Sequence, residues 1–309
     1  MFILPIVIPL FGLALVGWGL ARSQRILVPG WQKGVNDLTA KVLLPCVLFT
    51  GMYSHGLPEQ HTWALLFSFY LPLVCLFWGL FFALRYVKGR SQLAFAGSFS
   101  NLVFIGIPVV VNLFGDKGLQ YLFPIVAFHA LTIFSLYYLS EAWDNRVQGQ
   151  LLPALLKSVK NPIIIGLISG LIANLIHLPL PQVFLKILQM GARAALPCAL
   201  IVMGASLAGI SFKMAKWQML LILVSKLLLL PLFVLLTSHF LFDLPLFITR
   251  VLVVMACCPV GINVYVVVRA NGGDAQTVSS AILLSCWGSL LAWPFWLWVV
   301  HGLGVVSLG

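Results

Sequence analysis

Two apolar stretches of the chain combine proline, glycine and asparagine at close spacing. These residues are Asn101, Gly106, Pro108 and Asn112 in the first stretch, and Pro259, Gly261 and Asn263 in the second. Proline removes a backbone donor and glycine weakens a helix, so each combination predicts a broken helix. At membrane depth a broken helix persists only where protein or a water-filled cavity satisfies the freed groups. The N-terminus of each second half-helix then favours an anion, and two simple proline kinks are the alternative.

Arg193, Lys226 and His129 are ionisable residues within other apolar stretches. A charge at membrane depth is costly and usually functional, so we include Arg193 in the predicted anion site. The alternatives for Arg193 are snorkelling to an interface or bonding to carbonyls freed by Pro197, four residues later. Lys226 has the same alternatives. His129 is a candidate proton relay, with a structural histidine as its alternative.

The seven acidic residues all fall in or near predicted loops. They are Asp37, Glu59, Asp116, Glu141, Asp144, Asp243 and Asp274. No mid-membrane carboxylate is therefore predicted to bind a cationic substrate, and a proton is favoured over sodium as a coupling ion. The cysteines lack metal-ligand spacing, and no hydrolase or phosphate-binding motif occurs. We therefore predict no metal, no cofactor and no enzyme activity.

The composition requires a membrane around most of the chain. Of 309 residues, 61% are apolar and 8% are charged, whereas soluble domains carry about 25% charged residues. A spanning helix needs roughly 20 apolar residues, and the hydropathy pattern predicts about ten of them. The predicted spans are 2–21, 34–53, 62–86, 92–114, 118–140, 161–177, 183–209, 216–241, 246–269 and 276–300. The lipid bilayer is thus the expected partner, in an all-α integral membrane fold.

The distribution of lysine and arginine predicts the orientation. With the N-terminus outside, 13 basic residues fall on cytoplasmic connections and 3 fall on the outer side. Such an excess is typical of cytoplasmic loops. It predicts that both termini lie on the outer side. It also explains the net charge of +11 without any binding to nucleic acid.

The two halves of the chain repeat one another. The sequence Leu44-Pro45-Cys46 recurs as Leu196-Pro197-Cys198, and Pro108 recurs as Pro259, at offsets of 152 and 151 residues. Because each repeat holds five predicted spans, the second copy enters the membrane from the opposite side. The pattern predicts a 5+5 inverted repeat, which is typical of transporters.

This repeat sets the expected domain organisation. Residues 1–140 form the first five-helix repeat and residues 161–309 form the second, inverted one. Residues 141–160 connect them on the cytoplasmic side, and the apolar positions of 151–159 suit a short amphipathic helix there. A frayed start of the sixth span is the alternative. In that span Gly166 and Gly170 suit close helix packing, within the chain or with a second copy.

Several longer motifs occur in order along nearly the whole chain. They are Leu43-Leu44-Pro45-Cys46-Val47-Leu48-Phe49, Ser100-Asn101 through Pro108, Ala195-Leu196-Pro197 through Gly204-Ala205-Ser206-Leu207, Cys258-Pro259-Val260-Gly261-Ile262-Asn263, Gly272-Gly273-Asp274-Ala275, and Ser279 through Ser285. In this ordered set the sequence resembles the auxin efflux carrier family, in particular its short bacterial members, which are similar to malate and malonate permeases.

The resemblance implies a fold like that of the bile acid sodium symporters, in which spans 4 and 9 cross at their breaks. Spans 1, 2, 6 and 7 would form a scaffold and a homodimer face. Spans 3–5 and 8–10 would form a transport domain. The implied crossover residues are Asn101, Gly106, Pro108, Asn112, Pro259, Gly261 and Asn263. The chain lacks the long central loop of the family's plasma-membrane plant members. It also lacks a close copy of their N-P-N-x-Y element, having Gly106-Ile107-Pro108 instead, which favours a small carboxylate over auxin.

The sequence therefore predicts a multi-pass secondary transporter of a bacterial inner membrane. Its expected substrate is a small organic anion, such as malonate or malate, that moves by alternating access through a site at the crossover. Two other functions stay open. One is an anion channel of the same fold, and the other is a membrane sensor whose anion site signals to a partner.

Overall fold

The computed structural model describes residues 4–23, 30–56, 61–144, 162–208 and 217–306. Within these ranges the secondary structure is helical, apart from one isolated bridge between Ser100 and Val260. Six helical segments are long and apolar enough to cross a membrane, namely Trp31–Ser54, Thr62–Ala83, Leu102–Trp143, Gln182–Ser206, Trp217–Leu241 and Ala275–Leu303. This confirms an all-α membrane fold, while the ten-span count and the inverted repeat stay predictions.

The chain forms two compact units. Unit 1 comprises residues 1–60, 103–127 and 156–210, and unit 2 comprises residues 61–102, 128–155 and 211–309. Each unit therefore gathers segments from both halves of the sequence.

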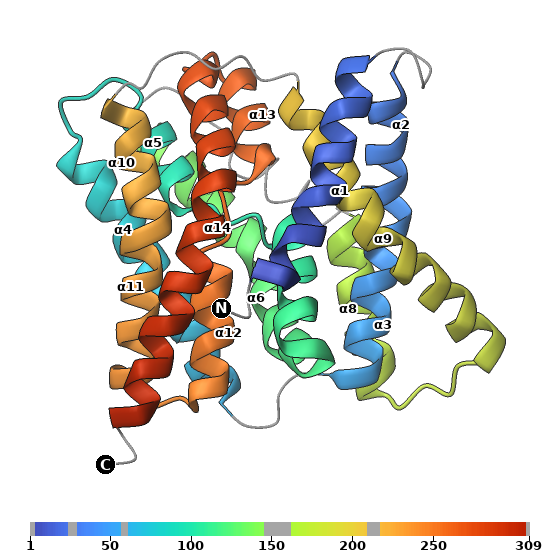
Figure 1. The fold of residues 1–309 in the computed structure, drawn as a ribbon. Helices are drawn as coiled ribbons and strands as arrows, with labels where there is room; N and C mark the ends of the chain where they lie inside the picture. Colours follow the sequence, from blue (N-terminus) through green and yellow to red (C-terminus); the bar gives the residue numbers. More distant parts are fainter. Residues whose placement is uncertain (1–3, 24–29, 57–60, 145–161, 209–216, 307–309) are drawn as a thin grey trace. The chain divides into compact units, whose positions relative to one another are not determined.

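Unit 1 is a bundle in which α1 packs on α9, and α3 packs on both α8 and α9 (Figure 1). Its helices are α1 (Leu4–Ser23), α2 (Trp31–Leu38), α3 (Leu44–His55), α8 (Pro162–Leu175), α9 (Gln182–Ala208) and the first part of α6 (Ile107–Trp143). A π-helical turn, Thr39–Leu43, joins α2 to α3. Helices α1, α3, α8 and α9 are mainly apolar, as lipid requires, whereas the short helix α2 is amphipathic.

Glycines let the helices of unit 1 approach closely. A Cβ atom on Gly166 would lie 2.7 Å from the carbonyl oxygen of Pro45, and one on Gly170 would lie 2.5 Å from that of Phe49. Small residues permit such backbone contact between membrane helices. The glycine pair of α8 therefore faces α3 of the same chain.

Unit 2 contains the remaining helices. They are α4 (Thr62–Ala83), α5 (Arg90–Ser98), α10 (Trp217–Val224), α11 (Leu230–Leu235), α12 (Leu246–Ala256), α13 (Ile262–Ala270), α14 (Ala275–Val306) and the last part of α6. The π-helical turns Ser225–Leu229 and Leu236–Leu241 continue α10 and α11 into one rod, which lies beside α14 (Figure 1).

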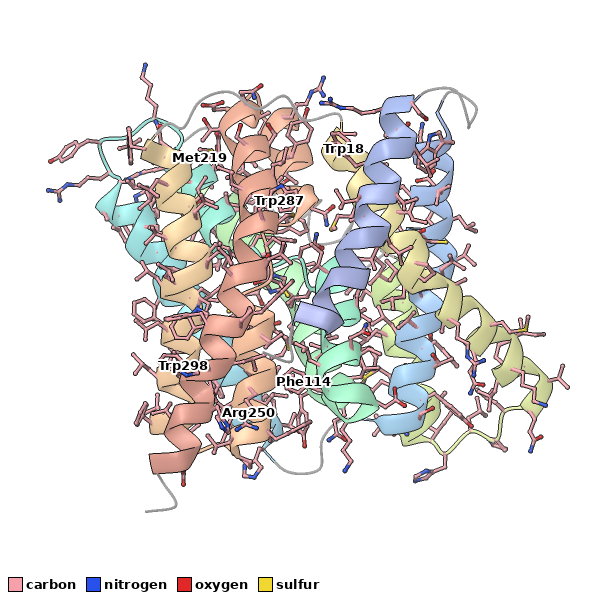
Figure 2. All side chains as sticks on the ribbon, viewed as in Figure 1. Trp18, Phe114, Met219, Arg250, Trp287 and Trp298 are labelled. Atoms are coloured by element: carbon pink, nitrogen blue, oxygen red, sulfur yellow. The ribbon has the colours of Figure 1, made fainter. Side chains whose placement is uncertain are left out.

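Tryptophan side chains of α14 stabilise the interior of unit 2. The indole nitrogen of Trp293 donates to the carbonyl of Val254 over 3.1 Å, and that of Trp296 donates to the carbonyl of Leu227 over 2.9 Å. Other tryptophans of the same helix are exposed, among them Trp287 and Trp298 (Figure 2). One helix thus supplies hydrogen bonds to the core and an apolar outer surface that suits lipid.

The connection between predicted spans 4 and 5 is shorter than expected. In place of a loop at residues 115–118, helix α6 turns at the single residue Gly115, whose φ is 63° and ψ is −161°. Glycine adopts this conformation without the steric cost that a Cβ atom would impose. Of the predicted connection 141–160, residues 141–143 end α6, and the expected amphipathic helix lies outside the described residues.

Candidate functional site

Two interruptions of helix lie near the predicted breaks and contact each other inside unit 2, the first of them before Gly106 and Pro108. Helix α5 ends at Ser98 and is followed by Phe99 in an extended conformation, while α12 ends at Ala256 and α13 begins at Ile262. The extended residues Ser100 and Val260 form an antiparallel bridge. The amide of Asn101 donates to the carbonyl of Pro259 over 2.9 Å. We call these two contacting segments, 99–101 and 257–261, the crossover.

Neighbouring helices satisfy the backbone groups that the breaks release. The amide of Ser100 donates to Nε2 of His129 on α6 over 3.1 Å, and the amide of Val260 donates to the hydroxyl of Ser285 on α14 over 3.0 Å. Unpaired buried amides are costly, so these side chains stabilise the extended segments. The predicted proton relay, His129, therefore also positions the backbone at the crossover.

Lys226 is a charged residue that forms hydrogen bonds to this arrangement. Its side chain is fully buried, and its Nζ donates to the hydroxyl of Ser100 over 2.6 Å and to the carbonyl of Ala256. The sequence showed this lysine only as an isolated charge in the apolar run 217–241. Its hydrogen bonds place it at the crossover, among residues far from it in sequence.

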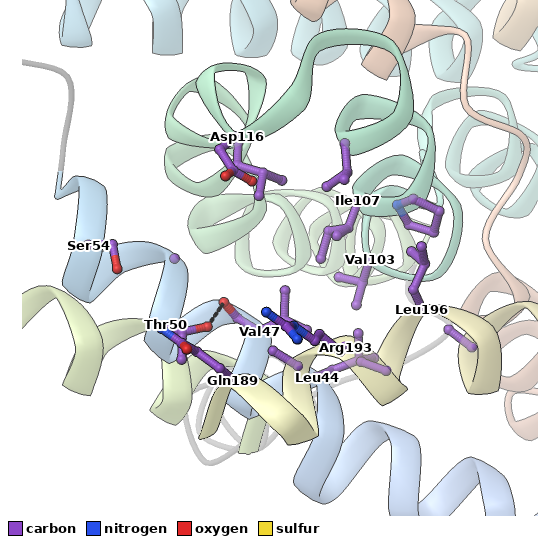
Figure 3. Close-up of a pocket in the computed structure, with 17 residues that line it drawn as sticks. Leu44, Val47, Thr50, Ser54, Val103, Ile107, Asp116, Gln189, Arg193 and Leu196 are labelled. Atoms are coloured by element: carbon purple, nitrogen blue, oxygen red, sulfur yellow. Dashed lines mark hydrogen bonds between the residues drawn. The ribbon is translucent and has the colours of Figure 1, made fainter. Parts of the chain in front are cut away.

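A second arrangement lies within unit 1, where a cavity of about 480 Å³ opens between α3, the first part of α6 and α9 (Figure 3). Most of its lining is apolar, including Leu44, Val47, Val103 and Ile107. Two predicted site residues, Pro108 and Arg193, line it together. Binding pockets of small molecules have this character, with a mainly apolar lining and a few polar groups.

The polar groups of the cavity come from three helices. Thr50 and Ser54 lie on α3, Asp116 lies on α6, and Gln189 and Arg193 lie one turn apart on α9 (Figure 3). The hydroxyl of Thr50 donates to backbone carbonyls of its own helix. Among the described residues, neither Arg193 nor Asp116 takes part in an ion pair. The guanidinium and the amide of Gln189 are therefore donors that a bound molecule can use.

The other predicted site residues are distributed between the two units. Asn112 is exposed, and its amide donates to the carbonyl of Pro108 over 2.8 Å, within the same helix. Gly106 is buried at the end of the π-helical turn Leu102–Gly106. Asn101 is buried at the crossover, whereas Asn263 is exposed in the first turn of α13.

Several polar residues of these two arrangements were not predicted as site residues. They are Thr50, Ser54, Ser100, Asp116, Gln189 and Ser285. Serine and threonine are frequent in membrane helices for packing reasons, so type alone gave no signal. In the part of the chain that the structure describes, no cluster of histidine, cysteine and acidic residues could hold a metal ion.

A family model described as membrane transport protein matches residues 2–297, which is nearly the whole chain. No curated protein matches the chain.

Proposed function

Since this chain belongs to the membrane transport protein family of auxin efflux carriers, we propose that it is a secondary carrier which moves a small organic anion by alternating access. The family makes it a membrane transporter. The cavity of unit 1 and the crossover of unit 2 support the finer proposal about substrate and mechanism.

The observation that carries the proposal is the position of Arg193 in the wall of a largely apolar cavity. A guanidinium binds a carboxylate through two parallel hydrogen bonds. The side chain of Arg193 is exposed, so a carboxylate that enters the cavity can reach it. The amide of Gln189, one turn earlier on α9, offers a further donor. A cavity of about 480 Å³ has room for a small carboxylate.

Asp116 restricts which carboxylate fits this cavity. It is a second charged group in the lining, of opposite sign to Arg193, and it belongs to a different wall (Figure 3). A substrate carboxylate close to Asp116 would be repelled, whereas a hydroxyl group could donate to it. A hydroxy monocarboxylate such as lactate therefore fits the lining better than a dicarboxylate such as malonate.

The crossover supports the same function. The N-terminus of α13 carries a partial positive charge and its N-cap residue, Gly261, provides no side-chain cap, so together with the exposed side chain of Asn263 it suits an anion. We therefore retain Asn101 and Asn263 as residues that orient the substrate during transport. A proton stays the favoured coupling ion, and no cofactor is proposed.

The surroundings of the protein belong to the same proposal. We propose a bacterial inner membrane, with both termini outside. We also propose a homodimer through spans 1, 2, 6 and 7. On α8, the exposed residues Ile165, Ile168 and Ile172 provide an apolar surface for lipid or a second copy.

Uptake into proteoliposomes tests the function. We would measure labelled malonate, malate and lactate with and without imposed proton and sodium gradients. A carrier shows saturable uptake and counterflow, a channel shows flux without counterflow, and a sensor binds the anion without flux. Loss of flux in both Asn101→Ala and Asn263→Ala would support the crossover, and its gradient dependence would identify the coupling ion.

Arg193→Gln is expected to reduce transport at low substrate concentration by about 100-fold. The reason is that each hydrogen bond from the guanidinium to the carboxylate contributes roughly 1.5–3 kcal/mol, and the glutamine amide replaces one of the two by a weaker neutral bond. A net loss of about 3 kcal/mol corresponds to roughly 100-fold. Because binding is affected, the concentration for half-maximal uptake should rise more than the maximal rate falls. Initial uptake rates over a range of substrate concentrations measure both quantities.

Lys186→Gln is the matched control, because Lys186 is an exposed cation on the same helix, two turns earlier, outside the cavity lining. We expect it to transport at the wild-type rate. Equal transport by wild type and Arg193→Gln would show that the anion binds elsewhere.

A further inference from the structure

We infer that the ammonium group of Lys226 takes the place of a bound sodium ion at the crossover. Carriers with broken helices bind sodium at such a position, and here the cation is covalently attached to the chain. The chain would then need no sodium, because its own side chain supplies the positive charge. The statement about transport rests on the proposed function, whereas the statement about the cation site concerns the folded protein alone.

The partners of Lys226 are those that a sodium ion would choose. Nζ donates to one hydroxyl oxygen, that of Ser100, and to one backbone carbonyl oxygen, that of Ala256. Unwound carbonyls and the C-terminal ends of half-helices coordinate sodium in secondary transporters. Both partners are neutral oxygen atoms, and one of them belongs to Ala256, the last residue of the half-helix α12.

Electrostatics explains why a cation belongs at this point. The carbonyls at the C-terminal end of a helix carry a partial negative charge, which the end of α12 directs toward the crossover. The amides of Cys257 and Cys258 pair with the carbonyls of Val253 and Met255. The carbonyl of Ala256 is left for the ammonium group, which the apolar surroundings would otherwise disfavour.

The same geometry excludes a second cation. Lys226 is fully buried, so its charge is poorly screened, and a sodium ion at the same oxygen atoms would be repelled. No acidic side chain is among the hydrogen-bond partners of Nζ in the described part of the chain. The positive charge of Lys226 is therefore stabilised by neutral hydrogen-bond acceptors, and both acceptors belong to unit 2.

Ser100 connects this charge to the rest of the crossover. Its hydroxyl accepts from Lys226, its amide donates to His129, and it forms the bridge with Val260. Removing the ammonium group should therefore loosen both extended segments together. A cation that enters the vacated space should restore them.

Thermal melting of the purified protein in detergent tests this inference without any substrate. We would compare wild type, Lys226→Ala, Lys226→Met and the exposed control Lys186→Ala. Each is measured in choline chloride, in sodium chloride, and with methyl-, ethyl- or propylammonium chloride added. Lys226→Met keeps most of the side-chain volume without the charge, so it leaves no space for an added cation.

We expect the melting temperatures of wild type and Lys186→Ala to be equal in choline and in sodium. The melting temperature of Lys226→Ala should rise by about 2–4 °C with sodium or an alkylammonium ion at a concentration several times its Kd. Lys226→Met should show no such rise, and its uptake of the carried anion should fall at least tenfold.

Three results would overturn the inference. They are a wild-type melting temperature that sodium raises, a Lys226→Ala protein that no added cation stabilises, and transport by Lys226→Met at the wild-type rate. If Lys226→Ala does not fold, the inference is tested by the melting temperature of wild type in sodium and in choline, and by anion uptake in Lys226→Met. If none of the anions is carried, the proposed function fails, while the melting measurements still decide whether Lys226 replaces a bound cation.

Discussion

Gly17→Ala is expected to lower the melting temperature by roughly 2–12 °C. A Cβ atom at Gly17 of α1 would overlap the backbone carbonyl of Ile201 on α9. A helix backbone cannot move aside as a side chain can, so the two helices must separate. Overpacking of this kind costs about 1–3 kcal/mol, and each kcal/mol corresponds to roughly 2–4 °C. Tryptophan fluorescence during heating in detergent measures the change.

Gly19→Ala provides the matched control on the same helix. A Cβ atom there meets nothing within 4 Å, and alanine is a better helix former than glycine by about 0.8–1 kcal/mol. We therefore expect its melting temperature to be unchanged or higher. The two substitutions are chemically identical and two residues apart, so opposite signs isolate the contact between α1 and α9. Equal melting of both variants would mean that the helices do not pack at this glycine.

Gly261→Ala is expected to reduce transport about 10–100-fold. A Cβ atom at Gly261 would overlap the ring of Phe99 across the crossover. That ring is enclosed by Phe95, His129 and Phe134, whose ring centroids lie 5.6, 5.1 and 6.0 Å away. Because the ring has little room to retreat, the extended segments must shift. Strain of about 1–3 kcal/mol reduces the transport rate by this factor if it raises the free energy of one transport conformation more than that of another.

A second-site change makes this prediction sharp. Phe99→Leu removes the ring that Gly261→Ala would strike, so the double variant should transport better than Gly261→Ala alone. Such non-additivity is expected for residues in contact. The control is Gly79→Ala on α4, where a Cβ atom meets nothing within 4 Å. Uptake rates, normalised to the amount of reconstituted protein, compare wild type, Gly261→Ala, Phe99→Leu, the double variant and Gly79→Ala. Purely additive effects would rule out the contact as the cause.

The fold class was determined by the sequence through simple physical quantities. A chain with 61% apolar and 8% charged residues cannot bury its apolar surface in water, so helices in lipid are the remaining solution. Most helix bounds also followed from hydropathy. Helix α9 was expected at 183–209 and spans Gln182–Ala208, and α4 was expected at 62–86 and spans Thr62–Ala83.

The helix breaks were predictable, but their positions were only partly so. Pro259 and Gly261 lie in the extended segment before α13, as expected for residues that disfavour a helix. In the first half of the chain the break falls at residues 99–101, before Gly106 and Pro108, and Pro108 lies in the first turn of α6. Proline is tolerated in a first helical turn, so a proline marks a nearby break without fixing its residue.

Which polar residues come together was decided by the tertiary structure alone. Arg193 and Pro108 share a cavity, yet 85 residues of sequence separate them. Lys226 and Ser100 form a hydrogen bond across 126 residues. Sequence patterns report periodicity along one helix, whereas these contacts depend on how helices pack against each other. Gly261 illustrates both levels. The sequence predicted that it interrupts a helix, whereas its contact with Phe99 depends on the tertiary structure.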